Sequence, residues 1–103
     1  MDVSILITTF NCYEYIAQSI NSCLNQSAHN LKYEIIVIND GSTDNTQKVL
    51  DSFKEKIVVF NIDNSGIEKA INFAFKKASG KYYIRLDADD YFHKDYLSEI
   101  EPL

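Results

Sequence analysis

The chain has 103 residues, with 46% hydrophobic and 13% aromatic side chains but only one proline and three glycines. This composition excludes a disordered tail or a linker and predicts one compact domain at most. The formal net charge of −5 argues against a nucleic-acid partner, which would require a basic surface. An acidic protein can still bind phosphate groups if a metal ion or a helix terminus supplies the positive field.

The amino terminus leads straight into an apolar run with no basic segment before it. No apolar stretch approaches the ~18 residues that indicate a membrane-spanning helix. We therefore expect neither a signal peptide nor a membrane span, and a cytoplasmic location. Cys12 and Cys23 have no histidine or further cysteine at metal-ligand spacing, so we expect small buried residues without a disulfide.

Two strands and one helix are predicted in the first part of the chain. Residues 3–9 are nearly all apolar and rich in β-branched side chains, as in a parallel strand covered on both faces. Apolar residues recur at helical spacing over residues 13–26, which predicts an amphipathic helix packed on the sheet. A loop at 27–32 leads to a second buried strand at 33–38.

The alternation of strands and helices continues after a dense group of turn residues at 39–45. Within this loop, Asp44 is expected to cap the following helix. The remaining predicted elements are a helix at 46–53, a strand at 57–60, a helix at 67–78, a strand at 82–86 and a helix at 96–101. The helix at 67–78 is expected to bury one apolar face, made of Ile67, Ala70, Ile71, Ala74, Phe75 and Ala78.

This element order predicts an α/β fold, with a mostly parallel sheet flanked by helices and with right-handed crossovers. In such sheets ligands bind outside the carboxyl ends of the strands. Polar clusters follow all four predicted strands, at 8–11, 39–42, 63–66 and 87–90. Because parallel strands end at the same edge, these clusters predict a binding site there.

Three carboxylates follow the last predicted strand. In extended chain, side chains two apart lie on the same side, so Asp87 and Asp89 are predicted to face one pocket while Ala88 turns away. Asp90 points to the other face and is expected to cap the next helix. Two like charges ~4 Å apart repel by roughly 4 kcal/mol at an effective dielectric of about 20, so we expect a cation between them. Oxygen ligands suit Mg²⁺ or Mn²⁺, whose coordination shell is completed by water and substrate phosphates. The alternative interpretation of these carboxylates is a solvated acidic turn.

Several motifs occur in a fixed order, each after a predicted strand or at a helix end. They are Val3–Asn11, Ile36–Asp44, Asn64-x-Gly66, Ala70-x-Asn72 and Ala78–Tyr82 leading into Leu86–Asp90. By these motifs, which cover nearly the whole chain, it resembles the amino-terminal half of family 2 glycosyltransferases. The resemblance implies a truncated GT-A fold, a Rossmann-like sheet in which residues 1–103 form a single nucleotide-sugar-binding domain.

The resemblance also implies an activity and a set of binding residues. The activity is transfer of a sugar from a nucleotide-diphosphate donor, most simply a UDP-sugar, to a glycan or lipid-linked acceptor, with inversion, as in cell-surface polysaccharide synthesis. The resemblance assigns the nucleoside contacts to Thr8, Phe10 and Asp40. It assigns Asp87 to the ribose or to the water shell of the metal, and Asp89 to the metal that binds the diphosphate. An aromatic ring can stack on a base, and a carboxylate can accept the ring N–H of uracil. The alternatives are a core aromatic at position 10 and an Asx turn or helix cap at position 40.

The resemblance places the catalytic base of the family in the acceptor half, beyond Leu103. We therefore expect no catalytic residue in this chain, which would bind the donor but not transfer sugar unaided. In the full-length protein, association with a membrane would be compatible with this role. The competing interpretation is a non-catalytic nucleotide-binding module that self-associates through exposed apolar surface.

Overall fold

The computed structural model describes residues 1–27 and 30–100. Its four strands form one sheet in the order β3-β2-β1-β4, and every pairing is parallel. The four carboxyl ends therefore lie at one edge, and the predicted α/β fold is confirmed. The strands are β1 (Val3–Thr9), β2 (Tyr33–Asp40), β3 (Val58–Ile62) and β4 (Tyr82–Asp87).

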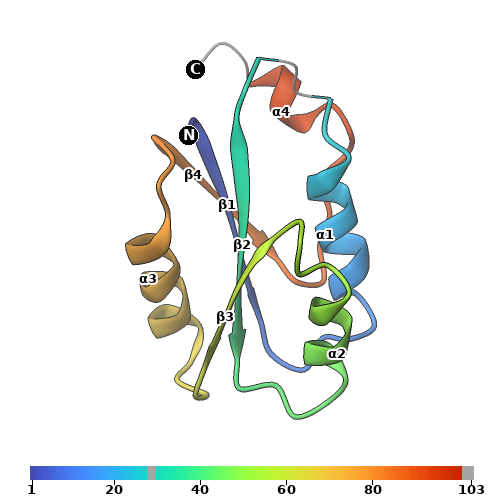
Figure 1. Ribbon diagram of the computed structural model, residues 1–103, viewed down its shortest axis with the longest axis vertical. Coiled ribbons are helices and arrows are strands. Elements are labelled where there is room, and N and C mark those ends of the chain that lie inside the picture. Colours follow the sequence, from blue (N-terminus) through green and yellow to red (C-terminus); the bar gives the residue numbers. More distant parts are fainter. Residues whose placement is uncertain (28–29, 101–103) are drawn as a thin grey trace.

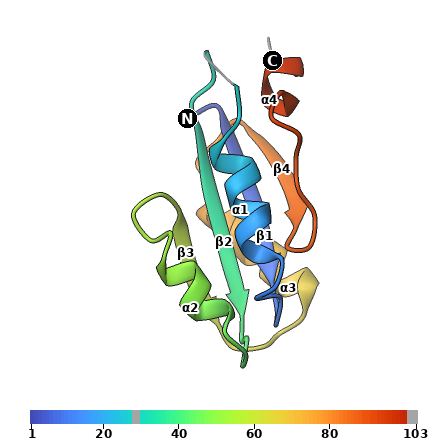
Figure 2. The same cartoon turned by 90° about the vertical axis from the view of Figure 1, so that its right-hand side faces the viewer.

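Helices cover both faces of the sheet (Figures 1 and 2). One face carries α1 (Ile16–Leu24), α2 (Thr46–Asp51) and α4 (Tyr96–Glu99), and the other carries α3 (Ile67–Lys77). Within residues 1–27 and 30–100, no helix has the length and apolar character needed to cross a membrane.

Alternate residues of the central strands enter two separate cores. The larger core joins β1 and β2 to α1, α2 and α4, and the smaller core joins the same strands to α3. Because both faces of the sheet are covered, these strands are apolar at successive positions. The larger core includes Val3, Ile5, Ile7, Ile16, Ile20, Val37, Leu50 and Leu97, and the smaller includes Leu6, Ile36, Ile38, Ala70, Ile71 and Ala74.

The first helix is shorter than its apolar pattern predicts. Instead of spanning 13–26 it begins at Ile16, because residues 13–15 form a turn. The backbone N–H groups of Tyr15 and Ile16 both donate to the Cys12 carbonyl, at 3.1 and 3.0 Å. Other bounds differ by one or two residues, since α2 ends at Asp51 and β3 covers 58–62 rather than 57–60. Residue 101, the predicted end of the last helix, lies outside the described residues.

The apolar face predicted for α3 is only partly buried. Ala70, Ile71 and Ala74 are buried, but Ile67 is 57% exposed and Phe75 is 37% exposed. Ile67 is the first residue of the helix, so no preceding turn covers it. Phe75 lies beside Tyr83 of the edge strand β4, with ring centroids 5.3 Å apart, and in the described part of the chain no strand lies outside β4. The prediction was therefore wrong at these two positions.

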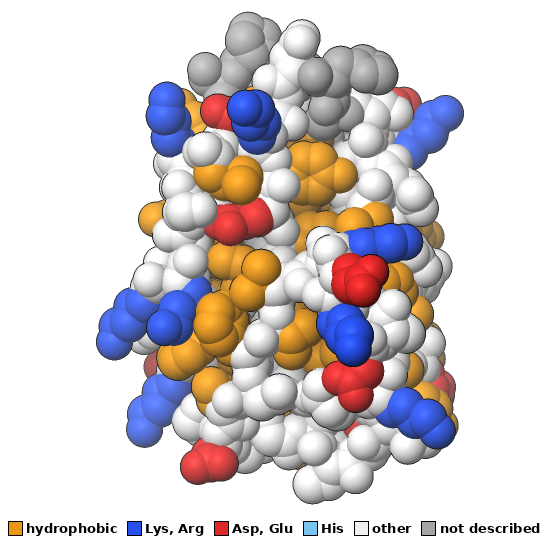
Figure 3. Space-filling model, in the orientation of Figure 1, with side chains coloured by type: hydrophobic (Ala, Val, Ile, Leu, Met, Phe, Trp, Pro, Cys, Tyr) orange, Lys and Arg blue, Asp and Glu red, His pale blue; other side chains and the backbone are white. Residues whose placement is uncertain are grey.

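The opposite edge of the sheet is formed by β3. Figure 3 shows hydrophobic side chains on this side of the molecule, with both basic and acidic side chains among and around them. Lys77 Nζ lies 5.4 Å from the ring centroids of both Phe60 and Phe73. A charged side chain over an edge strand discourages pairing with another chain.

At the amino-terminal edge, the Glu34 carboxylate ties β2 to β1 and to the turn before β4. Its Oε2 atom accepts hydrogen bonds from Ser4 Oγ at 2.5 Å and from the N–H and hydroxyl of Ser79 at 2.8 and 3.0 Å. The Gly80 N–H donates to Ser4 Oγ, and a Cβ at position 80 would lie only 2.6 Å from the Ser4 nitrogen. Burial alone would raise the pKa of Glu34, but these hydrogen bonds and the amino-terminal ammonium lower it below its usual 4.5.

We predict that Glu34→Gln lowers stability at neutral pH by about 1 kcal/mol, because a neutral amide accepts weaker hydrogen bonds than a carboxylate. Since the folded-state pKa is depressed, the stabilising contribution of Glu34 is complete above 4.5 and is lost as the pH falls through the lower folded-state value. Urea unfolding of both proteins across acidic pH measures this. The stability difference should shrink in acid, and a difference independent of pH would contradict the ionic role.

Candidate functional site

The residues selected from the sequence meet at the carboxyl edge of the sheet. Thr8 of β1 is paired with Asp87 of β4, and Thr9 is paired with Asn39 of β2. Asp40 is the last residue of β2. Parallel pairing thus brings residues from distant parts of the chain to adjacent strand ends.

Phe10 follows β1 and lies outside both cores. It is 51% exposed, so the alternative that it is a core aromatic is wrong. Thr8, two residues earlier, is half-buried. An exposed aromatic ring at a strand end is available for stacking against a planar ligand.

The Asp40 carboxylate is 5% exposed and holds the start of α3. Its Oδ1 accepts hydrogen bonds from the Ser65 N–H at 2.9 Å and the Ser65 hydroxyl at 3.4 Å, and its Oδ2 accepts from the Gly66 N–H at 3.1 Å. Gly66 precedes the first residue of α3 and has a φ of +92°, which suits glycine. Asp40, at the end of β2, therefore caps the amino terminus of α3. Among the described residues Oδ2 accepts only the Gly66 N–H, so this oxygen keeps a lone pair for a ligand.

Asn11, directly after Phe10, joins the β1–α1 loop to the β2–α2 loop. Its Oδ1 accepts hydrogen bonds from the N–H groups of Thr43 at 2.7 Å and Asp44 at 3.3 Å. Its own N–H donates to Ser42 Oγ at 3.0 Å. The φ of Asn11 is +50°, a left-handed conformation that asparagine tolerates better than most residues.

Asp44 stabilises the start of α2, as predicted. Its Oδ1 accepts from the N–H of Thr46 at 2.9 Å and from the Thr46 hydroxyl, and its Oδ2 accepts from the Tyr13 N–H at 3.4 Å. The cap position itself is Asn45. Desolvation alone would raise the pKa of Asp44, but the hydrogen bonds from Thr46 and Tyr13 lower it below its usual 3.8.

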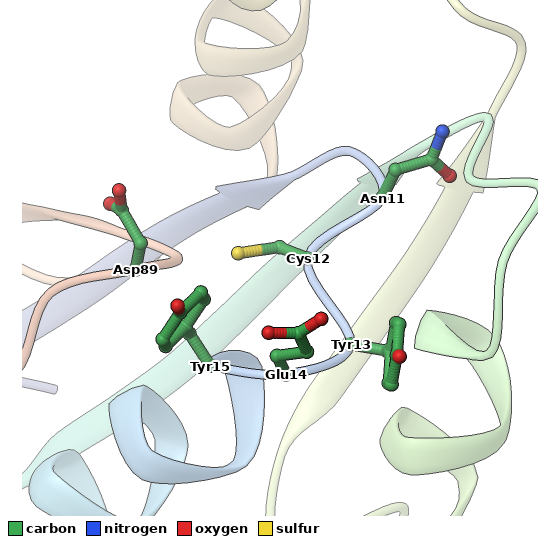
Figure 4. Close-up of a pocket in the computed structure, with 6 residues that line it drawn as sticks. All are labelled: Asn11, Cys12, Tyr13, Glu14, Tyr15 and Asp89. Atoms are coloured by element: carbon green, nitrogen blue, oxygen red, sulfur yellow. The ribbon is translucent and has the colours of Figure 1, made fainter.

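A hollow of about 220 Å³ lies between the β1–α1 loop and the acidic loop after β4 (Figure 4). In Figure 4 the Cys12 sulfur points toward Asp89, whereas the Asn11 side chain points away from it. Burial, followed by the nearby Asp89 charge, raises the pKa of the Cys12 thiol, which is therefore neutral at pH 7. The hollow is lined by Asn11, Cys12, Tyr13, Glu14, Tyr15 and Asp89. It is smaller than the ~300 Å³ at which drug-sized pockets begin, so it can hold only part of a nucleotide sugar.

The acidic loop is a turn rather than a continuation of β4. The strand ends at Asp87, and the Asp90 N–H donates to the Asp87 carbonyl at 3.0 Å. The extended geometry assumed for residues 87–89 therefore stops at Asp87, although both Asp87 and Asp89 are exposed and Ala88 is buried. Asp90 was wrongly predicted to cap the next helix, because its carboxylate accepts from the adjacent Tyr91 N–H and α4 begins farther along.

These carboxylates fit a divalent ion only together with a ligand. In the parts of the chain that the structure describes, no three His, Cys, Asp or Glu side chains are grouped so that they could hold a metal ion. Asp87 and Asp89 are exposed oxygen donors at one strand end. Mg²⁺ commonly takes one or two carboxylates and completes its shell with water and substrate phosphates. These carboxylate ligands therefore suit an ion that is shared with a bound phosphate group. They do not suit an ion coordinated by protein side chains alone.

The sequence model of glycosyl transferase family 2 matches residues 4–101. The chain belongs to this family. An uncharacterized glycosyltransferase of Mycoplasma genitalium is 36% identical over 102 residues, covering 94% of this chain and 34% of the relative. The resemblance inferred from the motifs is thus confirmed.

Solved structures share the fold of this family 2 domain. Staphylococcus aureus TarS 1-349 in complex with UDP matches with a TM-score of 0.87 and 32% identity, over 96% of this chain and 30% of that one. TarS 1-349 was also solved with UDP-GlcNAc. The mannosyltransferase PcManGT of Pyrobaculum calidifontis, in complex with GDP-Man and Mn²⁺, matches with a TM-score of 0.76 over 87% of this chain and 28% of that one, but its 23% identity shows the fold alone.

The predicted GT-A fold is confirmed by these matches. The family 2 domain covers 34, 31 and 29% of the first curated relatives, so it spans about a third of their length.

We predict that Asp40→Asn destabilises the family 2 domain by about 1–3 kcal/mol, because an amide N–H group would replace one buried acceptor of the α3 cap. Urea unfolding at neutral pH measures the change. Asp63→Asn is the matched control, because Asp63 is an exposed acid in the β3–α3 loop to which Asp40 is hydrogen-bonded. This variant should unfold like wild type. Wild-type stability of the Asp40 variant would show that the cap contributes little.

Proposed function

We propose that this family 2 domain binds the donor of a glycosyltransferase, a UDP-sugar, whose sugar passes to a glycan or lipid-linked acceptor. The observation that carries the proposal is the meeting of all four strand ends at one edge of the sheet, where a hollow lies between the β1–α1 loop and Asp89. The likeness to TarS, whose complexes contain UDP and UDP-GlcNAc, supports this donor class.

The nucleoside is proposed to bind at the ends of β1 and β2. Phe10 offers an exposed ring for the base, and Thr8 is half-buried two residues earlier, in β1. Asp40 keeps a lone pair on Oδ2 for the uracil N–H while it caps α3. Both roles of Asp40 use the same ionised carboxylate, so they are compatible.

The diphosphate is proposed to lie beside the acidic loop. Asp89 would hold Mg²⁺ or Mn²⁺ on the diphosphate, and Asp87 would contact the ribose or the water shell of the ion. The ion would supply a Lewis acid that neutralises the charge on the departing nucleoside diphosphate. Both carboxylates are exposed, so a phosphate ligand can approach without rearrangement of the cores.

Inverting transfer needs one further group. The acceptor hydroxyl attacks the anomeric carbon as the bond to the diphosphate oxygen breaks, and the hydroxyl proton passes to a base. We assign this base to a segment outside residues 1–103. The family 2 domain is accordingly proposed to bind the donor but not to transfer sugar unaided.

A non-catalytic, self-associating module is the second candidate. The observation that favours it is the exposed aromatic surface at β4, where Tyr82, Tyr83 and Phe75 lie on or beside an edge strand. Apolar surface at an open edge favours association of copies. Sedimentation velocity over a range of concentrations tests for a dimer, and UDP binding tests for the first function.

We predict that UDP binds wild type more tightly with Mn²⁺ than without it, and that Asp89→Asn weakens binding in Mn²⁺ by roughly tenfold or more, since even a residue supporting a metal ligand is worth about that factor. Isothermal titration calorimetry measures both effects. Asp90→Asn, an exposed neighbour with the same charge change, is the control. Equal affinity of wild type and Asp89→Asn would reject the metal assignment, and absence of UDP binding by wild type would reject the proposed function.

A further inference from the structure

The two segments proposed to bind the nucleoside lie beyond the region where β1 and β2 are paired with each other. The β1–β2 ladder ends at Thr9 and Asn39. Phe10 follows the last residue of β1 in this ladder, and Asp40, the last residue of β2, is paired with Ile62 of β3 but not with β1. Backbone pairing between these strands therefore does not fix the separation of the Phe10 and Asp40 side chains.

Side-chain hydrogen bonds continue where this ladder stops. The Asn11 Oδ1 accepts from two successive N–H groups of the β2–α2 loop, those of Thr43 and Asp44, at 2.7 and 3.3 Å. The N–H groups of residues 11 and 13 donate to side chains of the same loop, to Ser42 Oγ at 3.0 Å and Asp44 Oδ2 at 3.4 Å, and that of residue 12 donates to Thr46 Oγ1 in the first residue of α2 at 3.0 Å. We call this set of contacts the loop clasp.

The β2–α2 loop, to which the loop clasp attaches the β1–α1 loop, is itself anchored in the protein interior. The Ser42 N–H donates to Asn39 Oδ1 at 3.3 Å, and Asn39 Nδ2 donates to Gln47 Oε1 at 2.9 Å. Asn39 is buried. Gly41 also allows the β3–α3 loop to lie close to the β2–α2 loop, because a Cβ at position 41 would lie only 2.7 Å from the Asn64 nitrogen. Asn11 therefore attaches the β1–α1 loop to a part of the edge that is already fixed.

The Asn11 side chain acts from the far side of the loop. It points away from Asp89, toward β2 and the β2–α2 loop (Figure 4). Its backbone adopts a φ of +50°, which turns the chain between Phe10 and the hollow. A ligand that reaches Phe10 and Asp89 would thus meet a loop whose shape Asn11 sets.

We propose that Asn11 is a positioning residue for the nucleotide donor, one that holds the loop of Phe10 at a fixed separation from Asp40. The proposal rests on the proposed function, because it concerns the same donor site. Asn11 stabilises the bound geometry before the donor arrives, so its loss lowers affinity through added loop freedom and not through a lost ligand contact.

The test uses Asn11→Gly, because glycine also adopts the left-handed backbone conformation while it removes the side chain that carries the acceptor. We expect UDP affinity in Mn²⁺ to fall by about tenfold, the equivalent of one to two hydrogen bonds. Amide hydrogen exchange by NMR supplies a second readout, in which Thr43 and Asp44 should exchange faster in the variant. The stability control is Glu34→Gln, which weakens hydrogen bonds at the opposite edge and should leave UDP affinity unchanged.

The possible results separate the two proposals. If wild type binds UDP and Asn11→Gly binds it equally well, the positioning role is overturned while the proposed function stands. If Glu34→Gln weakens binding as much as Asn11→Gly does, the effect is one of general stability and the positioning role is again overturned. If wild type does not bind UDP, the proposed function fails and the positioning role fails with it.

Discussion

The parallel pairing of β1 with both β2 and β4 is the constraint on which the rest of the structure depends. β1 is hydrogen-bonded on each side to a strand running in the same direction. Parallel strands require crossovers, so helices cover both faces and the central strands are buried. The same geometry brings every strand-to-helix loop to one edge. A polar site at that edge is therefore a consequence of the fold and not of any single motif.

The polar residues at this edge divide into two groups by what their oxygens contact. Asp40 and Asp44 accept backbone N–H groups at the starts of α3 and α2, and Asn11 connects two loops. These residues build the edge and hold its loops together. Asp87 and Asp89 lie instead on an exposed turn, and that turn is attached to α1 through a hydrogen bond of 3.5 Å from Ser19 Oγ to the Asp87 carbonyl. The exposed pair is the part of the site best placed for a ligand from outside.

Local patterns predicted the features that depend on neighbouring residues. The buried strands follow from continuous apolar runs, and the role of Asp44 follows from a helix start only two residues away. A helix cap was one alternative for Asp40, but the helix that it caps and the contacts of Asn11 could not be predicted in this way, because the partners lie 25 to 33 residues distant. The one local signal at position 11 was an asparagine directly after a strand, a residue type that tolerates the left-handed conformation.

Two sequence-based errors share a physical cause. Helical spacing assigned Ile67 and Phe75 to a buried face, but burial also requires a neighbouring element at the end and at the side of the helix. Extended geometry was likewise assumed for Asp89, where the ladder with β1 has already ended. In both cases the periodicity was read correctly, and the extent of the packed or paired region was not visible in the sequence.

The central claim is that the carboxyl edge of this sheet binds a nucleoside diphosphate. NMR chemical-shift mapping of the whole chain with UDP and Mg²⁺ tests it most directly, because every backbone amide reports on its own surroundings. The account predicts that the changes concentrate at 8–12, 40–44, 64–66 and 87–90, with residues 79–82 around the Glu34 network unaffected. Changes centred on the Glu34 edge, or on the exposed aromatic surface of β4, would contradict it.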